Sequence, residues 1–169
     1  GSFENPVNIN TANSPRQVAI NDIDGDGKLD IATANYTANT VSVLINTAQL
    51  GTINANSFAT TLSLPAIAGS NSHGVAIGDV NGDGEPDIVS SSYSNPIVSV
   101  FTNETTSTTN VLFGDYNAYY TNATSGNNVS NIVSLADFNN DGMLDILTAN
   151  LGSSLSIFRN RSEEHTSEL

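Results

Sequence analysis

The feature that most constrains the fold of this chain is an internal repeat of 57 or 58 residues. Three copies of an apolar run that ends in an acid align at this spacing: Val18 to Asp22, Val75 to Asp79 and Val133 to Asp137. A second apolar run follows each acidic loop, and a third run ends in asparagine. A repeat of this length predicts tandem copies of one supersecondary unit, each covered by its neighbours.

The units have the pattern of short β-strands. Apolar residues alternate with polar ones in 41–46 and begin to do so in 98–103, which is the period of a half-buried strand. Residues 58–64 and, less clearly, 116–121 add a fourth strand, and turns rich in Gly, Asn, Ser and Thr separate the strands. Four short strands per tandem unit predict an all-β chain: a partial β-propeller of about three four-stranded antiparallel blades with calcium-binding hairpin loops.

The repeat also predicts the domain boundaries. We expect a propeller fragment over residues 1–160, and residues 3–9 have the pattern of an outer strand from a preceding blade. Three blades are too few for a ring of about four to eight, so we expect the parent protein to continue into further blades. Residues 161–169 have no strand periodicity and are interpreted as a non-native tail. The expected blades lie at approximately 15–64, 72–121 and 130–160.

An acidic loop of nine residues with the pattern D-x-[DN]-x-D-G-x-x-D follows the first strand of each unit. Side-chain oxygens at positions 1, 3, 5 and 9 can converge on one point if the loop coils tightly, and position 7 can add a backbone carbonyl. Calcium takes about six to eight oxygen ligands, so about three Ca²⁺ sites are predicted. The predicted metal-site residues are Asp22, Asp24, Asp26, Lys28, Asp30, Asp79, Asn81, Asp83, Glu85, Asp87, Asp137, Asn139, Asp141, Met143 and Asp145.

The glycines and the charges of these loops favour the same interpretation. Position 6 is always glycine, where we expect a sharp turn with positive φ. Without a cation, crowded carboxylates would raise one another's pKa values and destabilise the loop. Because ligand charge tunes affinity, the first loop, with four aspartates, is predicted to bind calcium most tightly. The other two loops carry Asn81 and Asn139 at position 3.

Two other interpretations of the acidic loops, a simple hairpin turn and an EF-hand, agree less well with the sequence. A lone Asp/Gly-rich loop is often a simple hairpin turn, but three copies in phase with the repeat argue against that reading. An EF-hand needs a bidentate Glu at position 12, where this chain has Thr33, Ser90 and Thr148. The flanking segments are also β-branched rather than helical, so an EF-hand is rejected.

Composition excludes several function classes. Seventeen acids against four bases give a net charge of −13, which disfavours binding to nucleic acid or anionic membranes. The absence of cysteine excludes disulfides and thiolate chemistry. His73 has no partner motif for a catalytic triad, so no enzyme is predicted. Tyr119 and Tyr120 can stack on a sugar ring or simply pack against the sheet.

The loop motif between two strands of a blade resembles the FG-GAP/VCBS repeat family, which includes the integrin α-subunit head. The phrases over 75–84 and Asn39 to Leu44 resemble the bacterial members. The resemblance implies calcium on hairpin loops at one face of a propeller, usually of seven blades, with ligands at positions 1, 3, 5 and 9 of each loop. The Glu85-Pro86 context and Asn140 depart from the family pattern without removing a ligand.

Together these features predict a non-catalytic, secreted or cell-surface module without membrane insertion. Structural calcium would stiffen its blades for interaction or adhesion with an unknown protein or glycan partner. Two alternatives remain open: a scaffold part of a carbohydrate-active enzyme similar to polysaccharide lyases, or a lectin.

Overall fold

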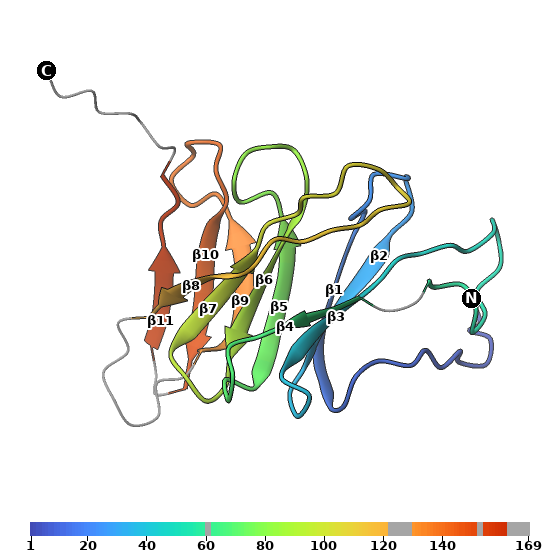
Figure 1. The fold of residues 1–169 in the computed structure, drawn as a ribbon, viewed down its shortest axis with the longest axis horizontal. Helices are drawn as coiled ribbons and strands as arrows, with labels where there is room; N and C mark the ends of the chain where they lie inside the picture. Colours follow the sequence, from blue (N-terminus) through green and yellow to red (C-terminus); the bar gives the residue numbers. More distant parts are fainter. Residues whose placement is uncertain (60–61, 122–129, 152–153, 162–169) are drawn as a thin grey trace, which may run out of the picture.

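A computed structural model describes residues 1–59, 62–121, 130–151 and 154–161. Three antiparallel sheets lie side by side, and the described residues form no helix (Figure 1). Each sheet is a meander whose strands follow the order of the chain. The prediction of an all-β chain built from short antiparallel strands is therefore confirmed.

The strand bounds follow the repeat. The first sheet has the order β1-β2-β3-β4 and contains β1 (Pro15–Asn21), β2 (Asp30–Asn35), β3 (Thr40–Leu44) and β4 (Leu62–Pro65). The second sheet has the order β5-β6-β7-β8 and contains β5 (Ser72–Gly78), β6 (Asp87–Ser92), β7 (Ile97–Phe101) and β8 (Asn117–Tyr120). The third has the order β11-β10-β9 and contains β9 (Ser130–Ala136), β10 (Asp145–Asn150) and β11 (Ser154–Phe158).

The sheets pack on one another through their first strands, because β1 contacts β5 and β5 contacts β9. One apolar cluster, with Val41 and Phe101 among its members, fills the space between the first and second sheets. A second cluster, which includes Val98 and Val133, lies between the second and third sheets. Side chains alternate between the faces of a strand, so the second sheet contributes to both clusters. Its strands β6 and β7 are buried on both faces, whereas β8 is exposed.

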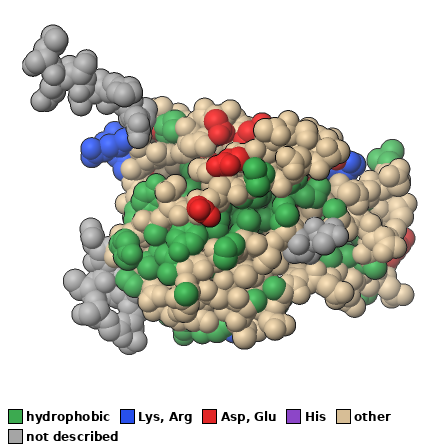
Figure 2. Space-filling model, viewed as in Figure 1, with side chains coloured by type: hydrophobic (Ala, Val, Ile, Leu, Met, Phe, Trp, Pro, Cys, Tyr) green, Lys and Arg blue, Asp and Glu red, His purple; other side chains and the backbone are tan. Residues whose placement is uncertain are grey.

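The outward faces of the first and third sheets stay exposed. Val18 and Ile20 of β1 are 63% and 62% exposed, and Leu155 and Ile157 of β11 are 67% and 57% exposed. In the view of Figure 2, hydrophobic side chains gather across the middle of the molecule, and acidic side chains lie above them. Alternating apolar residues on an exposed sheet face mark a surface that another element would cover.

The outer strand of a preceding blade predicted over residues 3–9 remains a prediction. These residues form no strand, and all but Ile9 are exposed. A strand exists only where its N–H and C=O groups pair with a neighbour, and no strand of the described residues lies beside this segment. Of the predicted tail 161–169, all but Arg161 lies outside the described residues.

Candidate metal centre

The three acidic segments are hairpin loops: loop 1 (22–30) joins β1 to β2, loop 2 (79–87) joins β5 to β6, and loop 3 (137–145) joins β9 to β10. In each hairpin, position 9 pairs with the residue that precedes position 1, so the loops close in the same register. Positions 4 and 6 have positive φ in all three loops, with Asn140 at φ 59° in loop 3. The predicted left-handed turn at the position 6 glycines is confirmed.

Backbone N–H groups hold the acidic side chains in the same arrangement in every loop. The carboxylate at position 1 accepts a hydrogen bond from the N–H of position 6 at 2.9 Å in each case. The side chain at position 3 accepts from the N–H of position 5 at 3.1, 2.9 and 2.9 Å. Position 5 accepts from position 7 at 2.8, 2.8 and 3.0 Å. The loop backbone therefore coils around its own side-chain oxygens.

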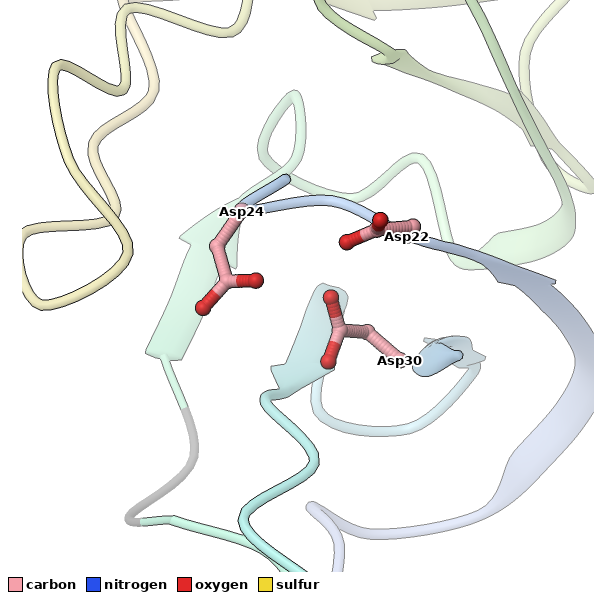
Figure 3. A group of neighbouring side chains, drawn as sticks. All are labelled: Asp22, Asp24 and Asp30. Atoms are coloured by element: carbon pink, nitrogen blue, oxygen red, sulfur yellow. The ribbon is translucent and has the colours of Figure 1, made fainter. Parts of the chain in front are cut away.

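Loop 1 brings three carboxylates together. One oxygen from each of Asp22, Asp24 and Asp30 lies within 4.8 Å of the others, and Figure 3 shows the three side chains converging from the loop and the start of β2. Asp22 Oδ1 is buried and accepts no hydrogen bond from the described residues. A buried anionic oxygen without a donor is costly unless a cation satisfies it. The residues of loop 1 thus fit a hard divalent cation such as calcium.

The electrostatics of loop 1 agree with this fit. Burial raises the pKa of Asp24, which is 6% exposed, and repulsion by Asp26 and Asp22 adds to the rise against the hydrogen bond from the Asp26 N–H. Burial likewise raises the pKa of Asp30, although two backbone N–H groups counteract it. The protein alone does not fully stabilise the negative charge of these carboxylates. A bound cation would stabilise that charge.

The aspartate at position 5 has a side-chain hydrogen-bond donor in every loop. In loop 1, Lys28 Nζ pairs with Asp26 Oδ2, and this bond holds the pKa of Asp26 below its ordinary value. In loops 2 and 3 the amide at position 3 donates to the carboxylate at position 5, at 2.8 Å for both Asn81–Asp83 and Asn139–Asp141. Among the described residues, neither of these loops has three carboxylates as close together as those of loop 1.

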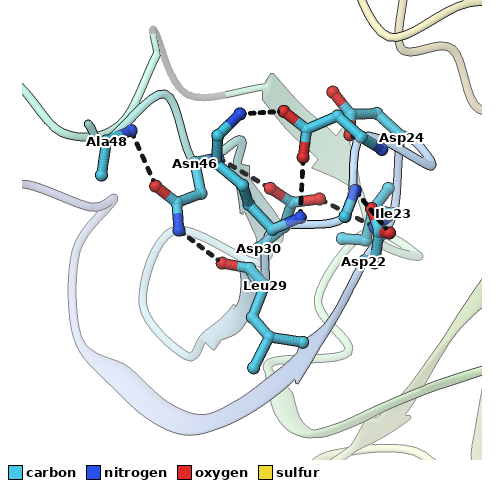
Figure 4. A network of polar contacts seen from close by, with 10 residues as sticks. Asp22, Ile23, Asp24, Leu29, Asp30, Asn46 and Ala48 are labelled. Atoms are coloured by element: carbon cyan, nitrogen blue, oxygen red, sulfur yellow. Dashed lines mark hydrogen bonds and ion pairs between the residues drawn. The ribbon is translucent and has the colours of Figure 1, made fainter. Parts of the chain in front are cut away.

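The aspartate at position 9 has a role that the motif alone does not reveal. Asp30 has no exposed surface, and its two oxygens accept hydrogen bonds from the N–H groups of Ile23 and Asn46, both at 2.7 Å (Figure 4). Asp87 makes the equivalent bonds at 2.9 and 2.8 Å, and Asp145 at 3.1 and 2.7 Å. This aspartate therefore joins the loop to the second residue after the third strand of its sheet.

Sequence reasoning missed that residue as part of the site. It is an asparagine in all three units, at 46, 103 and 160, and its side chain donates to the carbonyl of position 8 at 3.0, 3.1 and 3.0 Å. The sequence contained a signal for it, since the third apolar run of each unit ends in asparagine, in phase with the repeat. The residues at position 7 differ among the three loops. That their backbone carbonyls act as metal ligands remains a prediction.

The other polar candidates lie away from the acidic loops. His73 is stacked with Tyr93 at 5.5 Å between ring centroids, and Tyr36 meets both rings edge-on, at the opposite end of the strands. Arg16 lies over the Tyr36 ring at 4.8 Å. Tyr119 packs against Phe158 of the next sheet, which is the packing role weighed for it, while Tyr120 is 68% exposed.

Comparison with known proteins identifies the repeat. Residues 22–90 match the family model described as FG-GAP-like repeat. The match runs from loop 1 through β2, β3, β4, β5 and loop 2 into β6. No curated protein sequence matches the chain. No helix among the described residues is long and apolar enough to cross a membrane. The resemblance to FG-GAP-like repeats drawn from the loop motif is thereby confirmed over residues 22–90 of this chain.

Proposed function

We propose that this chain is a calcium-stabilised β-propeller segment of an interaction module. The observation that carries the proposal is the convergence of Asp22, Asp24 and Asp30 around a buried, unsatisfied Asp22 oxygen. Calcium would be held in loop 1 by the aspartates at positions 1, 3, 5 and 9 with the carbonyl of position 7, and in loops 2 and 3 by the equivalent residues. The ion would neutralise the repelling carboxylates and cross-link two strands.

The calcium is proposed to be structural rather than catalytic. Four or five protein oxygens fill most of a calcium shell, which leaves little coordination for a substrate. FG-GAP repeats typically form non-catalytic modules of extracellular proteins, and millimolar calcium outside cells suits sites of modest affinity. We therefore place this module outside the cell or on its surface, with a protein or a glycan as its partner.

The propeller is proposed from the packing of the sheets. Each sheet lies beside the next through its first strand, and the apolar outer faces of β1 and β11 are open. We propose blades at approximately 15–64, 72–121 and 130–160, covered at both ends by further blades of the same kind in the parent protein. A ring of about four to eight such units would bury these faces.

Thermal unfolding with and without calcium tests the proposal. With calcium at about one hundred times its dissociation constant, each site adds about 2.7 kcal/mol. For a chain of this size that corresponds to a rise in Tm of about 5–10 °C per site. Magnesium at equal concentration controls for ionic strength. The proposal fails if the curves in calcium and in chelator superpose.

Two variants locate the effect. Asp22→Asn removes a negative charge from loop 1 and replaces one carboxylate oxygen of Asp22 with an NH₂ group. It should reduce the calcium-dependent rise in Tm. Glu104→Gln removes the same charge from an exposed acid outside the loops and should leave the rise unchanged. An equal loss in both variants would mean that calcium acts by general screening of the acidic surface.

A further inference from the structure

The asparagine after the third strand also bonds across the boundary between sheets. Asn103 Nδ2 donates to the carbonyl of Ile23 at 3.0 Å, and Asn160 Nδ2 donates to the carbonyl of Val80 at 2.6 Å. Both acceptors are 80 residues earlier in the chain and occupy position 2 of the loop in the preceding sheet. The same contact therefore recurs at both sheet boundaries.

The orientation of the Asn103 amide is set by its own hydrogen bonds. Asn103 Oδ1 accepts from the N–H of Thr105 at 3.0 Å, so Nδ2 faces the carbonyls. An amide carries two N–H donors, and here one serves Pro86 of its own loop while the other serves Ile23 of the preceding loop. Asn103 is only 3% exposed, so both donors are removed from bulk water and both bonds are needed.

These contacts join the position 9 aspartates into one continuous chain of hydrogen bonds. Asp30 accepts the Ile23 N–H, and the Ile23 carbonyl accepts Asn103, whose N–H donates to Asp87. The same sequence then runs from Asp87 through Val80 and Asn160 to Asp145. The three aspartates are at most 1% exposed, so the chain of bonds runs through the buried base of all three loops.

We propose that Asn103 and Asn160 are positioning residues that couple each acidic loop to the sheet that follows it. Position 2 lies between two predicted metal ligands, so fixing both its N–H and its carbonyl fixes the spacing of those ligands. Loops 2 and 3 are also adjacent in space, since a Cβ built on Gly82 would lie 3.4 Å from Met143 Cε. A further consequence, which rests on the proposed function, is that calcium binding in one loop favours binding in the next.

Asn46 supplies a matched control. It makes the in-sheet bond to Leu29 at 3.0 Å and accepts the Ala48 N–H at 2.9 Å, as Asn103 does at the equivalent positions. Among the described residues, it has no carbonyl of a preceding loop to bond. Asn46→Ala and Asn103→Ala therefore remove the same local bonds and differ in the bond that crosses between sheets.

Amide hydrogen exchange resolved by residue tests the coupling. Asn103→Ala should speed exchange of the Ile23 amide by about fivefold to thirtyfold relative to the Ala32 amide of β2, because the buried Ile23 carbonyl loses its donor. Asn160→Ala should have the same effect on the Val80 amide, which provides a second test if the first variant folds poorly. Asn46→Ala should leave the Val80 and Phe138 amides at their wild-type rates.

Running each variant in calcium and in chelator separates this inference from the proposed function. If Asn103→Ala and Asn160→Ala change exchange only within their own sheets, the coupling is overturned, whatever calcium does. If calcium slows exchange in no loop while Asn103→Ala still speeds Ile23, the calcium proposal fails and the coupling stands. Faster exchange of Ile23 in Asn103→Ala, with calcium slowing all three loops, supports both.

Discussion

Loop 1 and loop 2 share one backbone frame and differ in how they arrange charge. Both coil around positions 1, 3 and 5 with nearly equal hydrogen bonds, and both place a buried aspartate at position 9. In loop 1, Asp24 brings a third carboxylate to the cluster and Lys28 pairs with Asp26. In loop 2, Asn81 stands at position 3 and donates to Asp83.

The difference separates two functions within one motif. The bonds that shape the loop are made by N–H groups and by the aspartate at position 9, which all three copies keep. The side chains at positions 3 and 7, which vary, set the charge presented to a cation. Position 9 therefore bears mainly on the shape of the loop, and positions 3 and 7 mainly on its charge, so variants at each position can test the two separately.

The largest effect is expected at position 9, which the loops share. Asp87→Ala leaves the buried N–H groups of Val80 and Asn103 without acceptors, and the free energy of unfolding should fall by about 2–4 kcal/mol. Asp30→Ala should behave alike. Denaturant unfolding in chelator measures this, with Glu104→Ala, an exposed acid outside the loops, as the control that changes stability little. A loss of stability seen only in calcium would show that position 9 acts as a metal ligand and not as a structural hydrogen-bond acceptor.

Position 3 is expected to control affinity. Asp24→Asn gives loop 1 the residue of loops 2 and 3 and removes one charge about 4 Å from a divalent ion, so calcium affinity at that loop should fall about tenfold to thirtyfold. Asn81→Asp makes the reverse change and should tighten loop 2. Calorimetric titration measures both. Unchanged affinity in both variants would contradict the predicted ranking of loop 1 as the tightest site.

Position 7 is expected to have a smaller effect. Lys28→Met gives loop 1 the residue of loop 3 and frees Asp26 from its ion pair, so calcium should bind up to about fivefold more tightly. The matched change Met143→Lys should weaken loop 3. Because the pair is exposed, both effects should shrink as salt rises in the titration. A weaker loop 1 in Lys28→Met would show that the lysine supports the loop and does not compete with the ion.

The smallest effect is expected from pH. Burial raises the pKa values of Asp30 and Asp87 above the ordinary 3.8, so the folded chain holds protons that the unfolded chain has released. Without calcium, the free energy of unfolding should therefore decrease as pH rises from about 3.8 through these raised values. With calcium, stabilisation should weaken as pH falls through the same window, because protons compete with the ion. Unfolding measured at several pH values tests both statements. The prediction is contradicted if the free energy of unfolding changes with pH in the same way with and without calcium.

Much of the fold was predictable because strand period and repeat length are local properties. The alternation in 41–46 and the 57- or 58-residue spacing placed the strands and the loops correctly, and the position 6 glycines predicted their left-handed turns. Residues 3–9 form no strand in this structure because pairing requires a neighbour, which periodicity does not supply. The acid pattern predicted that positions 1, 3, 5 and 9 of loop 1 converge. Asp22, Asp24 and Asp30 do lie together, whereas Asp26 pairs with Lys28, which the pattern did not indicate.

By itself, the sequence determined the all-β class and the acidic hairpin loops, which follow from residue types within a few positions of one another, and the tandem units, which follow from the 57- or 58-residue repeat. Only the tertiary structure showed that the buried Asp30, Asp87 and Asp145 hold backbone N–H groups, and that Asn103 and Asn160 bond to carbonyls 80 residues away. The physical reason is that a hydrogen bond depends on distance and direction in space. Contacts between neighbouring sheets arise only when packing brings their backbones together.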